Sequence, residues 1–246
     1  MSVESNLDAA SLERIIPEEL DSSGATGKAT LELHMERYQF ARTQLGAGSL
    51  LDIACGVGYG TAFLAEHSPE ITSATGVDLS ASAIDYARQR YKDSRLRFLQ
   101  ADAMEFHDDE GFENIVSLET IEHLPNPAIF IRRITAMLRK GGVLIGSVPV
   151  TPSMDGNPHH LTDFTESSFR VLFDGCGLEP TALLRQIQPF SAGDILTGKE
   201  KRVSRDHPGL LAFYRRHPSK LLLRLEATLR FGFQNRYLTI AWKKRV

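Results

Sequence analysis

The sequence contains little cysteine and no long apolar run. Only two cysteines, Cys55 and Cys176, occur among 246 residues, which argues against a disulfide framework and favours a reducing cytoplasm. A transmembrane helix would need about 18 or more consecutive apolar residues, and no such run is present. No basic-then-apolar leader is visible, so we expect no signal peptide. A hydrophobic content of 42% is sufficient for one well-packed domain.

The net charge of −3 conceals a strong asymmetry along the chain. From residue 199 to the C-terminus there are 13 Lys and Arg against three Asp and Glu, so this segment carries +10 and the remainder −13. Such segregation indicates an anionic partner: a phosphate group, a nucleic acid or a membrane surface. A basic face that serves only solubility is the alternative.

Short apolar strands alternate with amphipathic helices along most of the sequence, an order that predicts a parallel sheet with helices on both faces. A second set of elements follows with a different pattern and completes a seven-stranded, mostly parallel α/β fold. The predicted strands are 49–54, 71–78, 95–101, 112–118, 142–150, 178–188 and 236–243, and the predicted helices are 30–45, 60–68, 80–91, 127–140, 165–174 and a basic amphipathic helix at 208–230.

Polar clusters follow four of the predicted strands at the point where each strand ends. They are the glycine-rich turn around Gly56, then Asp78, Asp102 and the segment from Glu119 to His123. Ligands of open parallel sheets bind beyond the carboxyl ends of the strands. Because all four clusters fall at this edge, we expect a binding site there.

The glycine-rich turn, DIACGVGYGT, suits the close approach of a ligand to the backbone. Asp78 follows Gly56 by 22 residues, where an acid can accept both hydroxyls of a ribose. A dinucleotide fingerprint would place its third glycine at Thr61, and Asp52 would repel a pyrophosphate. An acid at position 52 suits a cationic, amino-acid-bearing ligand instead.

Over roughly residues 30–190 the sequence resembles the class I S-adenosylmethionine-dependent methyltransferases. LLDIACGVGYGT is similar to their first motif, with Ala54 where many members carry glycine. The resemblance implies a Rossmann-like fold and S-adenosylmethionine as cofactor. It implies that Asp78 holds the ribose, that Asp102 and Ala103 flank the adenine, and that Arg37 binds the cofactor's carboxylate. The expected cofactor site comprises Arg37, Asp52, Ala54, Cys55, Gly56, Gly58, Tyr59, Asp78, Leu79, Asp102, Ala103 and Leu118.

The resemblance also implies how the chain is organised. We expect a single methyltransferase domain over 1–246. It would contain an N-terminal arm and cap helix (1–45), a cofactor-binding core (46–190), a basic helical insertion (191–232) and a last strand (233–246).

Glu119, Glu122 and His123 are spaced i, i+3 and i+4, which would place them on one face of a short helix before Pro125. A solvated polar face is the ordinary interpretation of such a pattern. The segment ETIEHLPNP is, however, similar to quinone-biosynthesis O-methyltransferases and to small-RNA 3′-terminal 2′-O-methyltransferases. The latter hold a divalent ion with such a cluster and a later histidine, which corresponds to His160. This resemblance implies Glu119, Glu122, His123 and His160 as ligands of Mg²⁺ or Mn²⁺, with Glu122 and His123 catalytic; His123 as a general base without metal is the alternative.

Four protein ligands plus two substrate oxygens would complete an octahedral site, so we expect an acceptor with vicinal hydroxyls. The sequence is also loosely similar to bacterial glycan methyltransferases, which favours a sugar or glycan, phosphate- or lipid-linked. A catechol or quinone precursor, the 3′ end of an RNA, and a cofactor-binding regulator without chemistry are the alternatives. The basic, leucine-rich stretch at 199–230 suggests peripheral contact with the inner membrane face of the cytoplasm; nucleic acid is less favoured because no separate RNA-binding module is visible.

Overall fold

The computed structural model describes residues 25–150, 160–189, 214–232 and 234–246. Seven strands within these ranges form one sheet in the order β3-β2-β1-β4-β5-β7-β6. The strands from β1 to β5 pair in parallel, and β7 pairs antiparallel with β5 and with β6. The predicted seven-stranded, mostly parallel fold is confirmed. The strands are β1 (Gly48–Ile53), β2 (Ile71–Asp78), β3 (Leu96–Gln100), β4 (Phe112–Leu118), β5 (Leu138–Pro149), β6 (Leu178–Pro189) and β7 (Gln234–Lys244).

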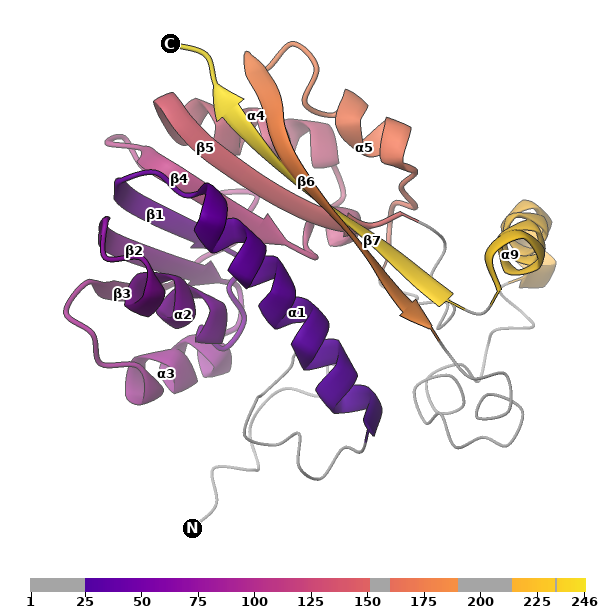
Figure 1. Cartoon of the computed structure of the whole chain (residues 1–246), viewed down its shortest axis with the longest axis horizontal. Coiled ribbons are helices and arrows are strands. Elements are labelled where there is room, and N and C mark those ends of the chain that lie inside the picture. The colour runs from indigo at the N-terminus through magenta and orange to yellow at the C-terminus, as the bar shows by residue number, and fades with distance from the viewer. Residues whose placement is uncertain (1–24, 151–159, 190–213, 233) are drawn as a thin grey trace.

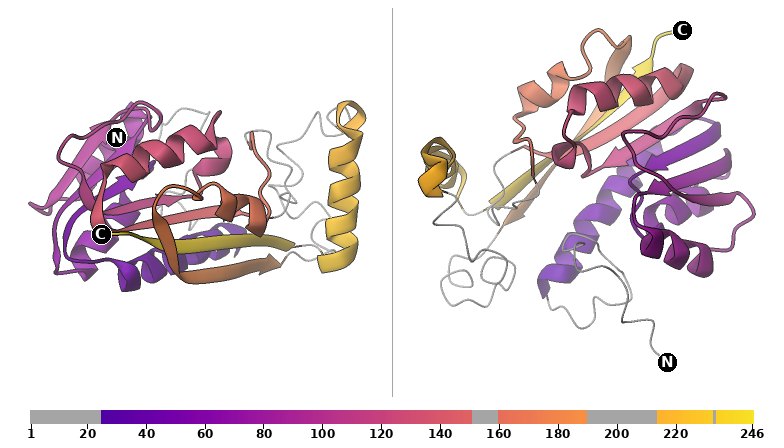
Figure 2. Two further views of the ribbon diagram at one scale, coloured as in Figure 1. Left: turned by 90° about the horizontal axis from the view of Figure 1, so that it is seen from above. Right: turned by 180° about the vertical axis from the view of Figure 1, so that it is seen from behind.

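Helices cover both faces of the sheet (Figures 1 and 2). On one face lie α1 (Ala25–Gln44), α2 (Tyr59–His67) and α3 (Ala81–Arg90), and on the other lie α4 (Pro127–Met137) and α5 (Glu166–Val171). The larger core cluster packs Phe130 of α4 and Phe169 of α5 against Ile115 and Trp242 of the sheet. A second cluster packs Tyr38 of α1 and Leu64 of α2 against the other face, so buried side chains on both faces fix the position of the sheet.

Several predicted helices differ from those observed at their ends, and the one predicted at 30–45 begins already at Ala25. The helix predicted at 127–140 ends at Met137, and β5 begins at Leu138, which pairs with Phe112. The helix predicted at 208–230 is represented by α9 (Pro218–Phe231) after a separate helical turn at 214–216, while residues 208–213 lie outside the described ranges. Proline favours the first turn of a helix and breaks a helix interior, so a break before Pro218 is expected.

The sheet pairing shows which segments reach the carboxyl edge. Leu118 at the end of β4 pairs with Ser147, and Pro149 at the end of β5 pairs with Tyr237 near the start of β7. Pro189, the last residue of β6, pairs with Gln234, the first of β7. The chain just before β7, which contains α9, therefore also emerges at this edge.

Candidate active site

The turn between β1 and α2 has an unusual backbone. Ala54, Gly56 and Gly58 have φ values of 64°, 58° and 80°, in the left-handed region that favours glycine. A Cβ placed on Gly56 would meet no atom within 4 Å among the described residues. The space beside Gly56 is therefore open, as a turn that receives a ligand requires.

Asp78 links this turn by hydrogen bonds to the turn that follows β2. Its Oδ2 accepts a hydrogen bond of 2.9 Å from the Gly56 N–H, and its Oδ1 accepts one of 2.9 Å from the Ser80 N–H. Leu79 beside it is exposed. Further along the edge, Asp102 Oδ1 accepts from the Met104 N–H at 2.8 Å, which fixes the turn that carries Ala103. The structure thus places the predicted ribose and adenine residues on consecutive turns of one edge.

Asp52 and Cys55 point into the protein instead of toward the open edge. The Asp52 carboxylate accepts hydrogen bonds from Thr61 Oγ1 at 2.7 Å and from the Tyr38 hydroxyl at 3.3 Å. Burial raises its pKa to about 6. The Cys55 side chain packs with Ile84 and Phe98. Direct contact between the Asp52 carboxylate and a cationic ligand, as the sequence suggested, does not match this arrangement; Asp52 supports the turn from inside.

Arg37 of α1 is 1% exposed, and its guanidinium lies 4.3 Å from the centre of the Tyr237 ring. Its Nη2 is 3.8 Å from a carboxylate oxygen of Glu119. Nε and Nη1 are buried without a hydrogen-bond partner among the described residues. Because a buried guanidinium ordinarily satisfies its donors, the two groups fit a carboxylate ligand of the kind that S-adenosylmethionine carries.

Glu119 does not lie on a helical face with Glu122 and His123. It has a φ of 50°, and the helical turn, a 3₁₀ helix, begins only at Ile121. Its N–H bonds to Ser147, and its Oε1 accepts from the Ser147 hydroxyl at 2.7 Å. Held by Ser147 and directed to Arg37, Glu119 is not part of the ligand group that the other three predicted residues form.

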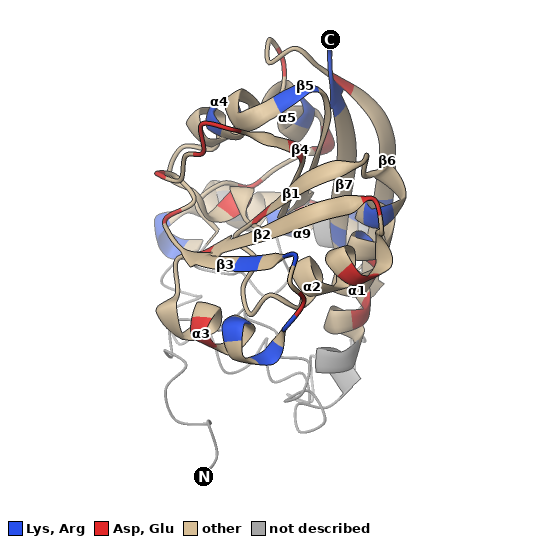
Figure 3. Ribbon diagram, turned by 90° about the vertical axis from the view of Figure 1, so that its left-hand side faces the viewer, with Lys and Arg blue, Asp and Glu red and all other residues tan. Residues whose placement is uncertain are grey.

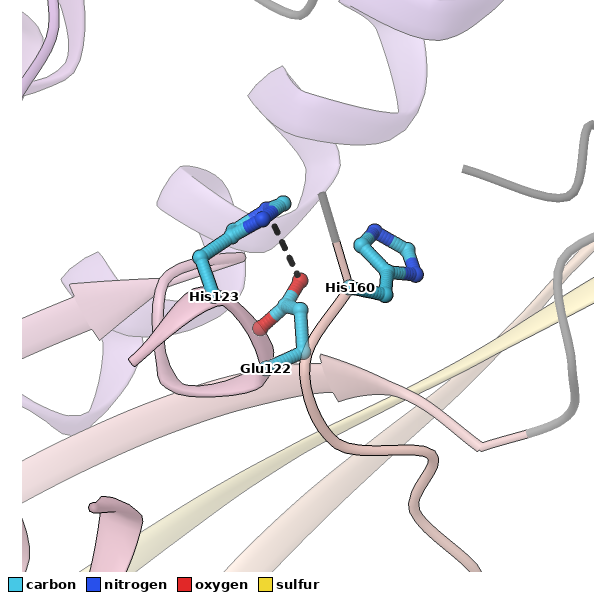
Figure 4. Close-up of side chains that lie close together, drawn as sticks. All are labelled: Glu122, His123 and His160. Carbon is cyan, nitrogen blue, oxygen red and sulfur yellow. Dashed lines mark ion pairs between the residues drawn. The ribbon is translucent and has the colours of Figure 1, made fainter. Parts of the chain in front are cut away.

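Glu122, His123 and His160 converge (Figure 4). One potential ligand atom from each lies within 4.8 Å of the others. The Glu122 carboxylate is 3.8 Å from His123 Nε2, and the two imidazole rings meet edge to face with centroids 4.8 Å apart. A carboxylate with two imidazoles is a donor set that Mn²⁺, Fe²⁺ or Zn²⁺ accepts readily and that Mg²⁺ tolerates.

Backbone hydrogen bonds explain why residues so distant in sequence meet here. The carbonyl of Glu122 accepts from the Leu161 N–H at 2.9 Å and from the Thr162 N–H at 3.1 Å. These bonds hold the segment before α5 against the 3₁₀ helix and place His160 beside Glu122. His159, the other histidine of this segment, lies outside the described residues.

Comparison with known proteins identifies the fold's family. Residues 51–146 match the family model described as a methyltransferase domain. This is a class I S-adenosylmethionine-dependent methyltransferase domain. An uncharacterized methyltransferase of Mycobacterium tuberculosis is 30% identical over 133 residues, which is 54% of this chain and 66% of that protein. A second protein of that organism, named a probable S-adenosylmethionine-dependent methyltransferase, is 28% identical over 202 residues, 72% of each chain.

Solved structures show the same fold. The N-methyltransferase NodS from Bradyrhizobium japonicum, in complex with S-adenosylhomocysteine, superposes with a TM-score of 0.57 at 18% identity, covering 87% of this chain and 86% of that one. S-adenosylmethionine is the cofactor of this family. The open turn at Gly56 and the unsatisfied donors of Arg37 fit it.

Sequence reasoning missed the residues that hold the site residues in place. Tyr237 stacks on Arg37, Ser147 fixes Glu119, and Thr61 with Tyr38 fixes Asp52. Ser147 offered a weak signal, since it is a polar residue in an apolar strand. The contact of Tyr237 with Arg37 depends on the tertiary fold, and no local pattern indicates it.

Proposed function

We propose that this methyltransferase transfers a methyl group from S-adenosylmethionine to a hydroxyl oxygen, with a divalent cation held by Glu122, His123 and His160. The observation that carries the proposal is the convergence of these three side chains within 4.8 Å of one another. They lie where β4 ends, on the same edge as the turn at Gly56. Glu122 is buried and the two histidines are only partly exposed, so the group is not a solvated polar face.

The chain's residues hold the cofactor in this proposal. S-adenosylmethionine, when bound, supplies an electrophilic methyl group. Arg37 would bind its carboxylate through Nε and Nη1, and Asp78 would accept from its ribose hydroxyls. Methyl transfer is an in-line displacement, so alignment of the acceptor oxygen at close range is the main demand on the protein.

The cation held by Glu122, His123 and His160 would act on the acceptor. A divalent cation supplies Lewis-acid polarisation that makes a hydroxyl oxygen more acidic. Glu122, His123 and His160 would hold it; in the alternative without a cation, His123, which is partly exposed beside Glu122, would accept the hydroxyl proton as a general base. Three protein ligands leave room for two acceptor oxygens. A vicinal diol of a sugar or glycan fits; a catechol and an RNA 3′ end offer the same pair of oxygens and are the alternatives.

The first experiment measures methyl transfer to a panel of sugars, catechols, RNA ends and amines, with and without EDTA. EDTA should stop transfer, and Mg²⁺ or Mn²⁺ should restore it. His160→Ala should lower kcat by about a hundredfold or more, because the cation would lose one of three ligands.

Two controls accompany this experiment. His67→Ala removes a histidine at the exposed end of α2 and should leave turnover unchanged. Calorimetry with S-adenosylhomocysteine should show the same affinity in His160→Ala and the native chain, since the cation acts on the acceptor alone. Full turnover in EDTA and in His160→Ala, or transfer to amines only, would refute the proposal.

A further inference from the structure

A stripe of exposed leucines runs along α9. Leu221, Leu225 and Leu229 are spaced four residues apart, and Leu222 lies between them on the same side of the helix. Their exposed fractions are 37%, 50%, 88% and 67%. Single exposed leucines are ordinary, but four on one side of a 14-residue helix form a continuous apolar surface.

Basic residues accompany this stripe. Arg215 and Arg216 precede the helix, and Lys220, Arg224 and Arg230 lie within it, whereas Glu226 is the helix's only acid. Arg215, Arg216 and Arg230 are exposed. An apolar stripe beside a strongly basic surface is the composition of helices that lie in the plane of a lipid interface.

The helix stands away from the sheet, beside the end of β6 and the start of β7 (Figures 1 and 2). That is the carboxyl edge, because α9 leads into Gln234, which pairs with the last residue of β6. α9, and with it the leucine stripe, therefore lies at the edge of the sheet where the acceptor would bind.

We propose that α9 docks the methyltransferase on an anionic lipid bilayer. The leucine stripe enters the boundary between headgroups and acyl chains, and the exposed Arg215, Arg216 and Arg230 contact lipid phosphates. Charge complementarity favours a membrane over a protein groove, because the chain from residue 199 onward carries +10. Docking here would present a lipid-linked acceptor to the carboxyl edge, although the proposal does not depend on which acceptor or metal is used.

The test is co-sedimentation of the full chain with vesicles of phosphatidylcholine alone and of phosphatidylcholine mixed with phosphatidylglycerol. The native chain should bind the anionic vesicles, bind the neutral ones at least about tenfold more weakly, and dissociate as salt increases. The double variant Leu225→Glu, Leu229→Glu should lose binding, as should Arg215→Glu, Arg216→Glu.

Matched controls place the same changes elsewhere. Val171→Glu alters an exposed apolar residue of α5, and Arg90→Glu with Lys92→Glu alters exposed bases near the end of α3; all should bind vesicles as the native chain does. The leucine variant should also keep its affinity for S-adenosylhomocysteine, which separates this proposal from that on catalysis. No binding to anionic vesicles, binding that the leucine changes leave intact, or a dimer that these changes dissociate would each overturn it.

Discussion

Arg37 illustrates how the site depends on residues from distant parts of the chain. It comes from α1, lies over Tyr237 of β7 and faces Glu119 after β4. Glu119 in turn is fixed by Ser147 of β5. The buried Arg37 guanidinium has one carboxylate at 3.8 Å, and its Nε and Nη1 have no hydrogen-bond partner among the described residues. It can therefore bind a second anion.

Replacement of Arg37 by Gln should therefore weaken S-adenosylhomocysteine binding by about tenfold to a hundredfold, because a charge-assisted hydrogen bond to the cofactor's carboxylate is lost. Calorimetry measures this directly. Methylthioadenosine, which lacks the amino-acid portion, should bind the variant and the native chain alike. Equal weakening for both ligands would mean that Arg37 only supports the fold.

Asp52 provides a prediction about pH. Burial raises its pKa from 3.8 to about 6. A carboxyl with a raised pKa in the folded state favours folding fully below its unfolded pKa, and that contribution is lost as pH rises through the folded value. As pH rises from about 4 to about 7, the cofactor-free native chain should therefore lose about 2–3 kcal/mol of unfolding free energy that the Asp52→Asn variant keeps.

Urea unfolding at both pH values tests this, with Asp109→Asn as control, since Asp109 is an exposed acid beside His107. A difference between Asp52→Asn and the native chain that does not change with pH would show that Asp52 titrates as an ordinary acid.

At the scale of elements, α5 and the segment before it determine where His160 lies. Phe169 packs with ring centroids 5.9 Å from Phe164, 5.4 Å from Phe173 and 5.6 Å from Trp242. Thr165 begins the helix with a capping box through Ser168. These contacts and the bonds to the Glu122 carbonyl hold His160 in place.

Phe169→Ala should therefore lower the unfolding free energy by about 3–5 kcal/mol, because it leaves a cavity among packed rings. Phe169→Leu, which fills more of the space, should lose less. Urea unfolding measures both. In addition, Mn²⁺ affinity should fall in Phe169→Ala more than in a variant with an equal loss of stability far from α5, such as Ile71→Ala. A loss of less than about 1 kcal/mol would contradict the packing described here.

The elements and their order were predictable because hydrophobic periodicity and glycine or proline boundaries mark them locally. The end of α4 was not predictable, because Leu138, Arg139 and Lys140 suit a helix terminus. The pairing of Leu138 with Phe112 places these residues in β5 instead. Glu119 was misplaced for a related reason. No sequence pattern indicates a positive φ at a residue other than glycine.

At the scale of the whole molecule, basic residues are concentrated in the last part of the chain and acidic residues in the part before it. The face over β3 and α3 carries both signs interspersed (Figure 3), whereas the chain from residue 199 onward carries +10. No helix among the described residues is long and apolar enough to cross a membrane. The sequence revealed the charge segregation, but only the sheet pairing shows that α9 emerges at the carboxyl edge.

The most direct measurement is a crystal structure of the full chain with S-adenosylhomocysteine and Mn²⁺, examined for anomalous density. We predict one manganese peak coordinated by Glu122, His123 and His160, with Glu119 still bonded to Ser147 and facing Arg37, and with the product's carboxylate on Arg37. A structure with the product bound at full occupancy and no manganese at these three side chains would contradict the account.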